Sequence, residues 1–181
     1  MRSSVPLLLA LAACRGADTS DVKSPDPGDS AAGPAFDAPW EGLDATDEAA
    51  GAFEADIGDD LAGPGWFHTG SDAVWGAEGA WARVEEPEGA SEPIVVVSIG
   101  GRAQEQVLVL QIVAPRSAWG EGELTVDGTS AAGVLTRYEG GTGTPFAYVV
   151  GGTVSLAEAG DADGEDVRGE FSSLSIAEVT P

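Results

Sequence analysis

The chain has few of the residues that build disulfides and zinc sites, and no long apolar run. Among its 181 residues there is one cysteine and one histidine. A single cysteine excludes an intramolecular disulfide. One histidine and one cysteine cannot supply the four nitrogen and sulfur ligands of a usual zinc site. The apolar runs at 94–99 and 107–113 have the length of strands, whereas a membrane-spanning helix needs roughly 20 apolar residues.

Positive charge is also scarce. Eight Lys and Arg residues stand against 31 Asp and Glu residues, which gives a formal net charge of −23. Such a chain repels phosphate backbones and anionic lipid headgroups. We therefore expect no nucleic-acid partner. Any contact with a membrane should not depend on electrostatic attraction to the lipid headgroups.

The first 13 residues have the layout of an export signal. Arg2 supplies a positive charge, residues 5–11 are mostly apolar, and small residues follow. The sequence Leu11-Ala12-Ala13-Cys14 resembles the lipobox of bacterial lipoproteins. This resemblance implies that diacylglycerol is attached to the Cys14 thiol and that cleavage frees the Cys14 amine for a further acyl chain, so that several chains anchor the protein. The alternative is an ordinary cleavage site beside an incidental cysteine.

The segment after the lipobox predicts a tether. Residues 14–50 are rich in Asp, Pro, Gly, Ser and Ala and poor in large apolar side chains, so we expect a disordered acidic linker, with a short helical turn over 45–52. Inner-membrane lipoproteins of this kind usually have Asp where this chain has Arg15, so the resemblance implies the outer membrane or cell surface. The chain thus divides into a signal peptide (1–13), a linker from the lipidated cysteine (14–50) and a folded domain (51–181).

The folded domain alternates apolar and polar residues with the period of β-strands. Two β-branched runs, 94–99 and 106–113, predict a central hairpin with both faces largely covered. In the last strand, a change of phase near Ser172-Ser173 predicts a β-bulge. The expected fold is all-β, a single antiparallel β-sandwich or flattened barrel. The strands are expected at 53–57, 66–68, 74–75, 80–85, 94–99, 106–113, 123–126, 134–138, 146–150, 152–158 and 167–179.

Two stretches near the C-terminus carry a second resemblance. Gly152-Thr-Val-Ser-Leu and Val167-Arg-Gly-Glu-Phe, after the hairpin at 94–113, resemble strands of small bacterial β-sandwich lipoproteins of unknown function. The resemblance covers about residues 50–179. It implies the fold and no active residues.

Two groups of polar residues are candidate sites. His68, Ser71 and Asp72 form a Ser–His–Asp set on paper, but no nucleophile-elbow motif accompanies them, and a turn is the simpler interpretation. The second group resembles the start of a calcium loop without the Glu at its twelfth position. A solvated hairpin tip is the simpler interpretation there. This group consists of Asp161, Asp163, Glu165 and Asp166. Asp56, Asp59 and Asp60 form a separate, weaker acidic group.

The sequence therefore predicts a lipid-anchored cell-envelope protein with a non-catalytic β domain. We expect no cofactor beyond the covalent lipid at Cys14 and no metal site. Five tryptophans offer aromatic faces for a carbohydrate or an envelope protein, although core burial is their commoner fate. A passive surface-coat lipoprotein is the alternative, and a hydrolase built around His68 is a third hypothesis.

Overall fold

A computed structural model describes residues 42–58, 63–70, 74–88, 90–103 and 106–179, but not the side chains of 74–78 and 102–103. These residues form nine strands and one 3₁₀ turn, η1 (Arg116–Ala118), joined by loops. The prediction of an all-β fold is confirmed. The strands are β1 (Asp47–Asp56), β2 (Gly65–Thr69), β3 (Val74–Glu85), β4 (Ile94–Ala103), β5 (Gln106–Pro115), β6 (Gly122–Thr125), β7 (Ala132–Glu139), β8 (Thr142–Ala159) and β9 (Asp166–Glu178).

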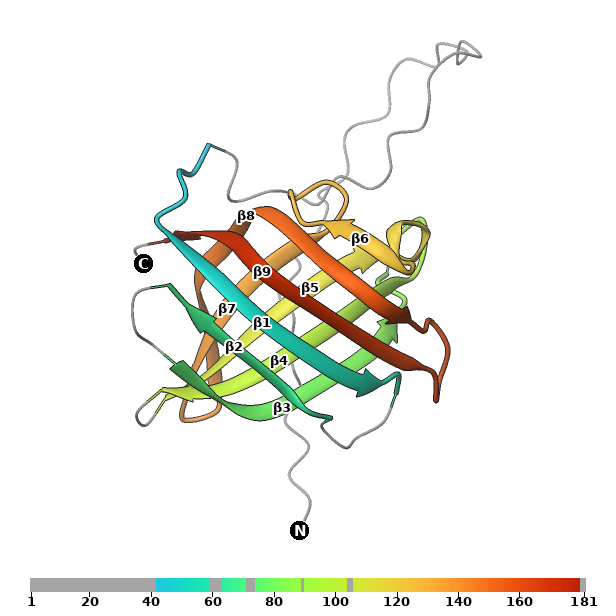
Figure 1. Cartoon of the computed structure of the whole chain (residues 1–181), viewed down its shortest axis with the longest axis horizontal. Helices are drawn as coiled ribbons and strands as arrows, with labels where there is room; N and C mark the ends of the chain where they lie inside the picture. The colour runs from blue at the N-terminus through green and yellow to red at the C-terminus, as the bar shows by residue number, and fades with distance from the viewer. Residues whose placement is uncertain (1–41, 59–62, 71–73, 89, 104–105, 180–181) are drawn as a thin grey trace.

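All the strands belong to one antiparallel sheet that closes on itself as a barrel (Figure 1). The strands follow the order β8-β7-β5-β4-β3-β2-β1-β9, and β9 then pairs with β8 to complete the ring. The strand β8 has 18 residues, so its first part pairs with β7 and its later part with the short strand β6. Of the two forms that the sequence allows, the barrel is the one observed.

The barrel interior is filled by one continuous hydrophobic cluster. Alternate side chains point inward, as in Val95, Val97 and Ile99 of β4, which are all fully buried. The three phenylalanines Phe53, Phe67 and Phe171 supply the largest inward side chains on β1, β2 and β9. Eight strands enclose a space that side chains just fill, so the interior is a packed core.

The predicted central hairpin is β4 and β5. Its strands pair from Ile94 opposite Pro115 to Ala103 opposite Gln106. Much of its outward face is covered as well, since Ile94, Val96 and Val113 form a second small cluster, and Val107 and Val109 are half-buried. This confirms that both faces of the hairpin are covered.

The bulge predicted near Ser172-Ser173 is confirmed. Opposite β1, the register shifts between Ala49, which faces Leu174, and Gly51, which faces Phe171. One residue of β1 therefore stands opposite two of β9, which lets both halves of β9 direct their apolar side chains inward.

Three sequence predictions need correction. The sequence predicts a helical turn over 45–52, but β1 begins at Asp47 and runs through these residues. The short strands at 74–75 and 80–85 are one strand, β3, and those at 146–150 and 152–158 are parts of β8. At Gly79 and Gly152 the φ angles of 131° and 129° allow a bulge where the sequence indicates a turn.

The predicted signal peptide (1–13), Cys14 and the linker as far as residue 41 lie outside the described residues. The first strand starts at Asp47, four residues before the expected start of the domain at 51. In the part of the chain that the structure describes, there is no helix with the length and apolar character to cross a membrane.

Candidate functional site

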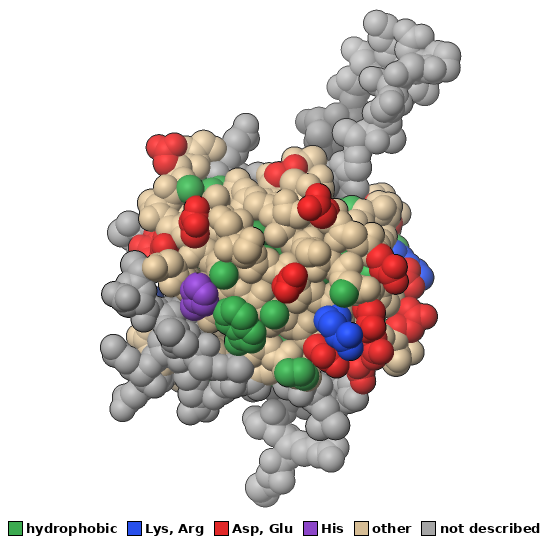
Figure 2. Space-filling view, viewed as in Figure 1, with side chains coloured by type: hydrophobic (Ala, Val, Ile, Leu, Met, Phe, Trp, Pro, Cys, Tyr) green, Lys and Arg blue, Asp and Glu red, His purple; other side chains and the backbone are tan. Residues whose placement is uncertain are grey.

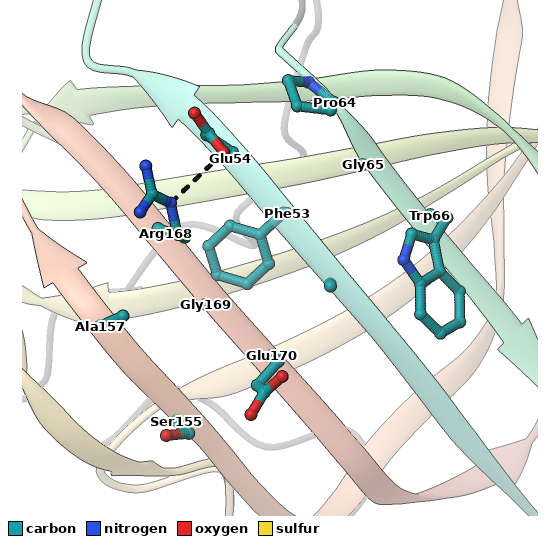
Figure 3. Close-up of a pocket in the computed structure, with 11 residues that line it drawn as sticks. Phe53, Glu54, Pro64, Gly65, Trp66, Ser155, Ala157, Arg168, Gly169 and Glu170 are labelled. Atoms are coloured by element: carbon teal, nitrogen blue, oxygen red, sulfur yellow. Dashed lines mark ion pairs between the residues drawn. The ribbon is translucent and has the colours of Figure 1, made fainter.

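A shallow depression of about 410 Å³ lies on the outer wall of the barrel (Figure 3). It extends over β1, β2, β8 and β9, which adjoin one another on the near side of the barrel in Figure 1. It is lined by Ala52, Phe53, Glu54, Pro64, Gly65, Trp66, Ser155, Ala157, Arg168, Gly169 and Glu170.

Strand register places outward side chains in a row across this wall. Trp66 of β2 lies opposite Ala52 of β1, which in turn lies opposite Glu170 of β9. Glu170 faces Ser155 of β8, and Ser155 faces Glu123 of β6. Inward and outward side chains alternate along each strand, so the burial of neighbours such as Phe53 and Phe67 fixes this row on the outside. The row combines an indole, a methyl group, two carboxylates and a hydroxyl.

Trp66 is the main apolar group exposed at the site. It is 45% exposed and stacks on His68, with the ring centroids 5.7 Å apart and the ring planes 15° from parallel. The cross-strand neighbours of these rings on β1 are Ala52 and Ala50, which are too small to cover them. Figure 2 shows the purple His68, the chain's single histidine, beside hydrophobic side chains on this wall. Trp66 and His68 thus form a stacked aromatic pair, here called the aromatic platform, in which Trp66 is exposed and His68 is half-buried.

A charged cluster borders the other side of the depression. Arg168 Nε lies 3.3 Å from Glu54 Oε2, and Arg168 Nη1 lies 3.5 Å from Glu158 Oε1. The hydrogen bond to Glu54 and the charge of Glu158 raise the pKa of Arg168 above its ordinary value. In Figure 3 Arg168 turns toward Glu54, while Glu170 lies further along β9, on the side of Ser155. The positive charge of Arg168 is thus already matched by two carboxylates.

Three polar groups of the row remain available to a ligand. Among the described residues, neither the Trp66 indole N–H, nor the Ser155 hydroxyl, nor the Glu170 carboxylate has a hydrogen-bond or ion-pair partner. The indole is a donor, the carboxylate is an acceptor and the hydroxyl is both. The site therefore presents mixed hydrogen-bonding groups beside an aromatic face.

The predicted Ser–His–Asp set is not assembled by the described residues. His68 is on β2 and stacks on Trp66, while Ser71 and Asp72 lie outside the described residues. The stacking on Trp66 makes His68 part of the aromatic platform.

The predicted calcium loop uses its carboxylates to hold its own shape. Arg116 Nε donates to Asp161 Oδ2 at 2.6 Å, and this hydrogen bond lowers the pKa of Asp161. Glu165 Oε2 accepts from the backbone N–H groups of Asp161 and Ala162 at 2.9 and 3.2 Å. Within the described ranges, no three His, Cys, Asp or Glu side chains come together as a metal site. In the weaker acidic group, Asp59 and Asp60 lie outside the described residues.

Among the three tryptophans whose side chains the structure describes, Trp66 is the exposed one. Trp119 is buried and its Nε1 donates to the carbonyl oxygen of Gly160 at 3.0 Å. Trp81 is half-buried and covers Gly100. The order Trp66-Phe67 carried a signal for the site, because neighbours on a strand point to opposite faces and only one of the two can enter the core.

Comparisons of the chain with protein-family models, with curated proteins and with solved structures find no match.

Proposed function

We propose that this protein is a lipid-anchored binding module of the bacterial cell envelope, and that the wall carrying Trp66 is its binding surface. In this account Cys14 carries the lipid, the acidic segment after it is the tether, and the barrel is non-catalytic. Arg15, at the position where inner-membrane lipoproteins usually have Asp, supports a location at the outer membrane or cell surface.

The exposure of Trp66 is the observation that carries the binding role. A tryptophan buries about 200 Å² when fully covered, so an exposed fraction of 45% leaves roughly 90 Å² for a ligand to cover. At about 25 cal/mol per Å², covering this area favours binding by about 2 kcal/mol. Aromatic side chains are the usual anchors of binding surfaces.

The form of the depression favours binding over catalysis. A hydrolase needs a nucleophile or general base that a partner group orients within hydrogen-bond reach. Among the described residues, the Ser155 hydroxyl has no such partner. The depression is open, and Glu54 on its rim is held by Arg168. A passive surface-coat lipoprotein, the alternative, has no use for an exposed indole beside unpaired polar groups.

The lipid anchor has a direct test in detergent phase partition. The full chain produced in a bacterial host should enter the detergent phase, and Cys14→Ser should move it to the aqueous phase because the acyl chains are lost. Labelled palmitate should be incorporated only by the wild type. Detergent partition of Cys14→Ser equal to that of the wild type would refute the anchor.

The binding surface is tested by sedimentation with isolated envelopes of the source bacterium. The full chain carrying Cys14→Ser is used, so that no lipid contributes. Adding Trp66→Ala should weaken saturable binding by about thirtyfold, which corresponds to about 2 kcal/mol. Leu43→Ala, which removes another exposed hydrophobic side chain, is the matched control and should leave binding unchanged. Equal binding by Trp66→Ala would overturn the proposal, and an absence of saturable binding in every form would favour the passive coat.

A further inference from the structure

The groups left free around Trp66 define the chemistry of the ligand. We infer that the ligand is a neutral oligosaccharide that lies across β2, β1, β9 and β8. This inference rests on the proposed function and names the ligand class of the same surface.

A sugar ring matches both parts of the site. Its C–H face is apolar and suits the open indole face, while its hydroxyls both donate and accept hydrogen bonds. The Glu170 carboxylate accepts such bonds, the Trp66 N–H donates, and the Ser155 hydroxyl does either. The hydrogen bonds to Glu170 are charge-assisted, which makes them the stronger ones.

The charges of the site disfavour ionic ligands. An anion would meet Glu54 and Glu170 within a chain of net charge −23. A cation would leave the indole N–H of Trp66 without an acceptor. The carboxylates spread along the chain also attract cations without preference for this wall. A neutral ligand with both donors and acceptors avoids these conflicts.

The row is longer than one sugar ring. From Trp66 on β2 to Ser155 on β8 there are three steps between paired strands. At about 4.8 Å for each step, the two side chains are roughly 14 Å apart. The ligand therefore spans more than one sugar unit, with one ring on Trp66 and the next near Glu170 and Ser155.

The test separates a sugar from a protein ligand and works for any sugar that carries vicinal diols. Isolated envelopes are treated with proteinase K, or oxidised with periodate and then reduced, and washed before the full chain carrying Cys14→Ser is added. We expect binding to survive proteinase K and to fall at least tenfold after periodate, which cleaves vicinal diols. Loss of binding after proteinase K with binding intact after periodate would overturn the inference.

Two variants connect this result to the site. Glu170→Gln keeps the shape but loses charge-assisted acceptance, so binding to proteinase-treated envelopes should weaken about fivefold. Glu121→Gln, at an exposed position outside the depression, is the matched control and should have no effect. If Trp66→Ala abolishes binding to envelopes while periodate has no effect, the binding surface stands and the saccharide inference fails. If Trp66→Ala binds normally, the proposed function itself fails.

Discussion

Gly169 on β9 lies against the aromatic core directly under the proposed binding surface. It pairs with Phe53 of β1 and with Leu156 of β8. A Cβ atom at this position would lie 2.6 Å from Phe53 Cζ and 3.0 Å from Leu156 Cδ2. Carbon atoms in contact normally stay about 3.5 Å or more apart, so Gly169→Ala has to displace the Phe53 ring.

Two opposing effects determine how far Gly169→Ala changes the free energy of unfolding. Overpacking a core costs about 1–3 kcal/mol, whereas replacing glycine by alanine stabilises by about 0.4–1 kcal/mol through the unfolded chain. We therefore expect Gly169→Ala to lower the free energy of unfolding by about 1–2 kcal/mol. For a domain of this size, that lowers Tm by roughly 4–8 °C.

Urea denaturation of the full chain carrying Cys14→Ser measures this effect. Gly151→Ala on β8 is the matched control, since its nearest neighbour would be Ser175 Cβ at 4.0 Å, and it should be neutral or slightly stabilising. Phe53→Leu makes room for the new methyl group, so the double variant with Gly169→Ala should be more stable than the sum of the single effects. Strict additivity, or a Gly169→Ala variant as stable as the wild type, would refute this packing.

Three further predictions concern the ends of the barrel. Because the hydrogen bond from Arg116 lowers the pKa of Asp161, this hydrogen bond stabilises the folded protein at pH values above the unfolded-state pKa of about 3.9. The stabilisation is lost as the pH falls through the lower pKa that Asp161 has in the folded protein. The stability difference between wild type and Asp161→Asn should therefore shrink below about pH 4 in acid titrations of unfolding, and a constant difference would contradict this. Trp119→Phe removes the donor to the Gly160 carbonyl and should lower the free energy of unfolding by about 1 kcal/mol, as measured by urea denaturation. A difference no larger than the experimental scatter would contradict this. Gly141→Ala forces φ near 85° on alanine and should cost about 1–2 kcal/mol by the same assay, whereas an unchanged midpoint would argue against this turn.

Most of the strands could be predicted from the alternation of apolar and polar residues along short stretches of the chain. Strands such as β4 and β5 follow directly from their β-branched runs, and the bulge at Ser172-Ser173 follows from a change of phase along β9. Both signals lie in residues that are neighbours in the sequence, so the sequence of a single strand is sufficient to detect them.

Closure of the sheet could not be predicted in the same way. It depends on pairings such as Asp47 with Ile176, which are far apart in the chain. A sandwich and a barrel require the same alternation along each strand, so alternation cannot choose between them. Gly79 and Gly152 were misleading for a related reason, because a glycine that permits a turn also permits a bulge within a continuous strand.

The candidate site was only partly visible in the sequence. That one of Trp66 and Phe67 faces outward follows from their adjacency on one strand. The partners of Trp66 do not follow from it, because Glu170 and Ser155 reach the same row only through the register of four strands. The sequence therefore offered the tryptophans as candidates without the polar groups that accompany one of them.

The most direct test of the binding surface observes the indole N–H resonances of the five tryptophans by NMR. The ¹⁵N-labelled full chain carrying Cys14→Ser is titrated with glycan fragments released from proteinase-treated envelopes, and Trp66→Ala identifies the Trp66 signal. We expect the Trp66 resonance to shift with saturation while those of Trp81 and Trp119 stay in place. A Trp66 resonance that does not move, while another tryptophan responds, would contradict the assignment of this wall as the binding surface.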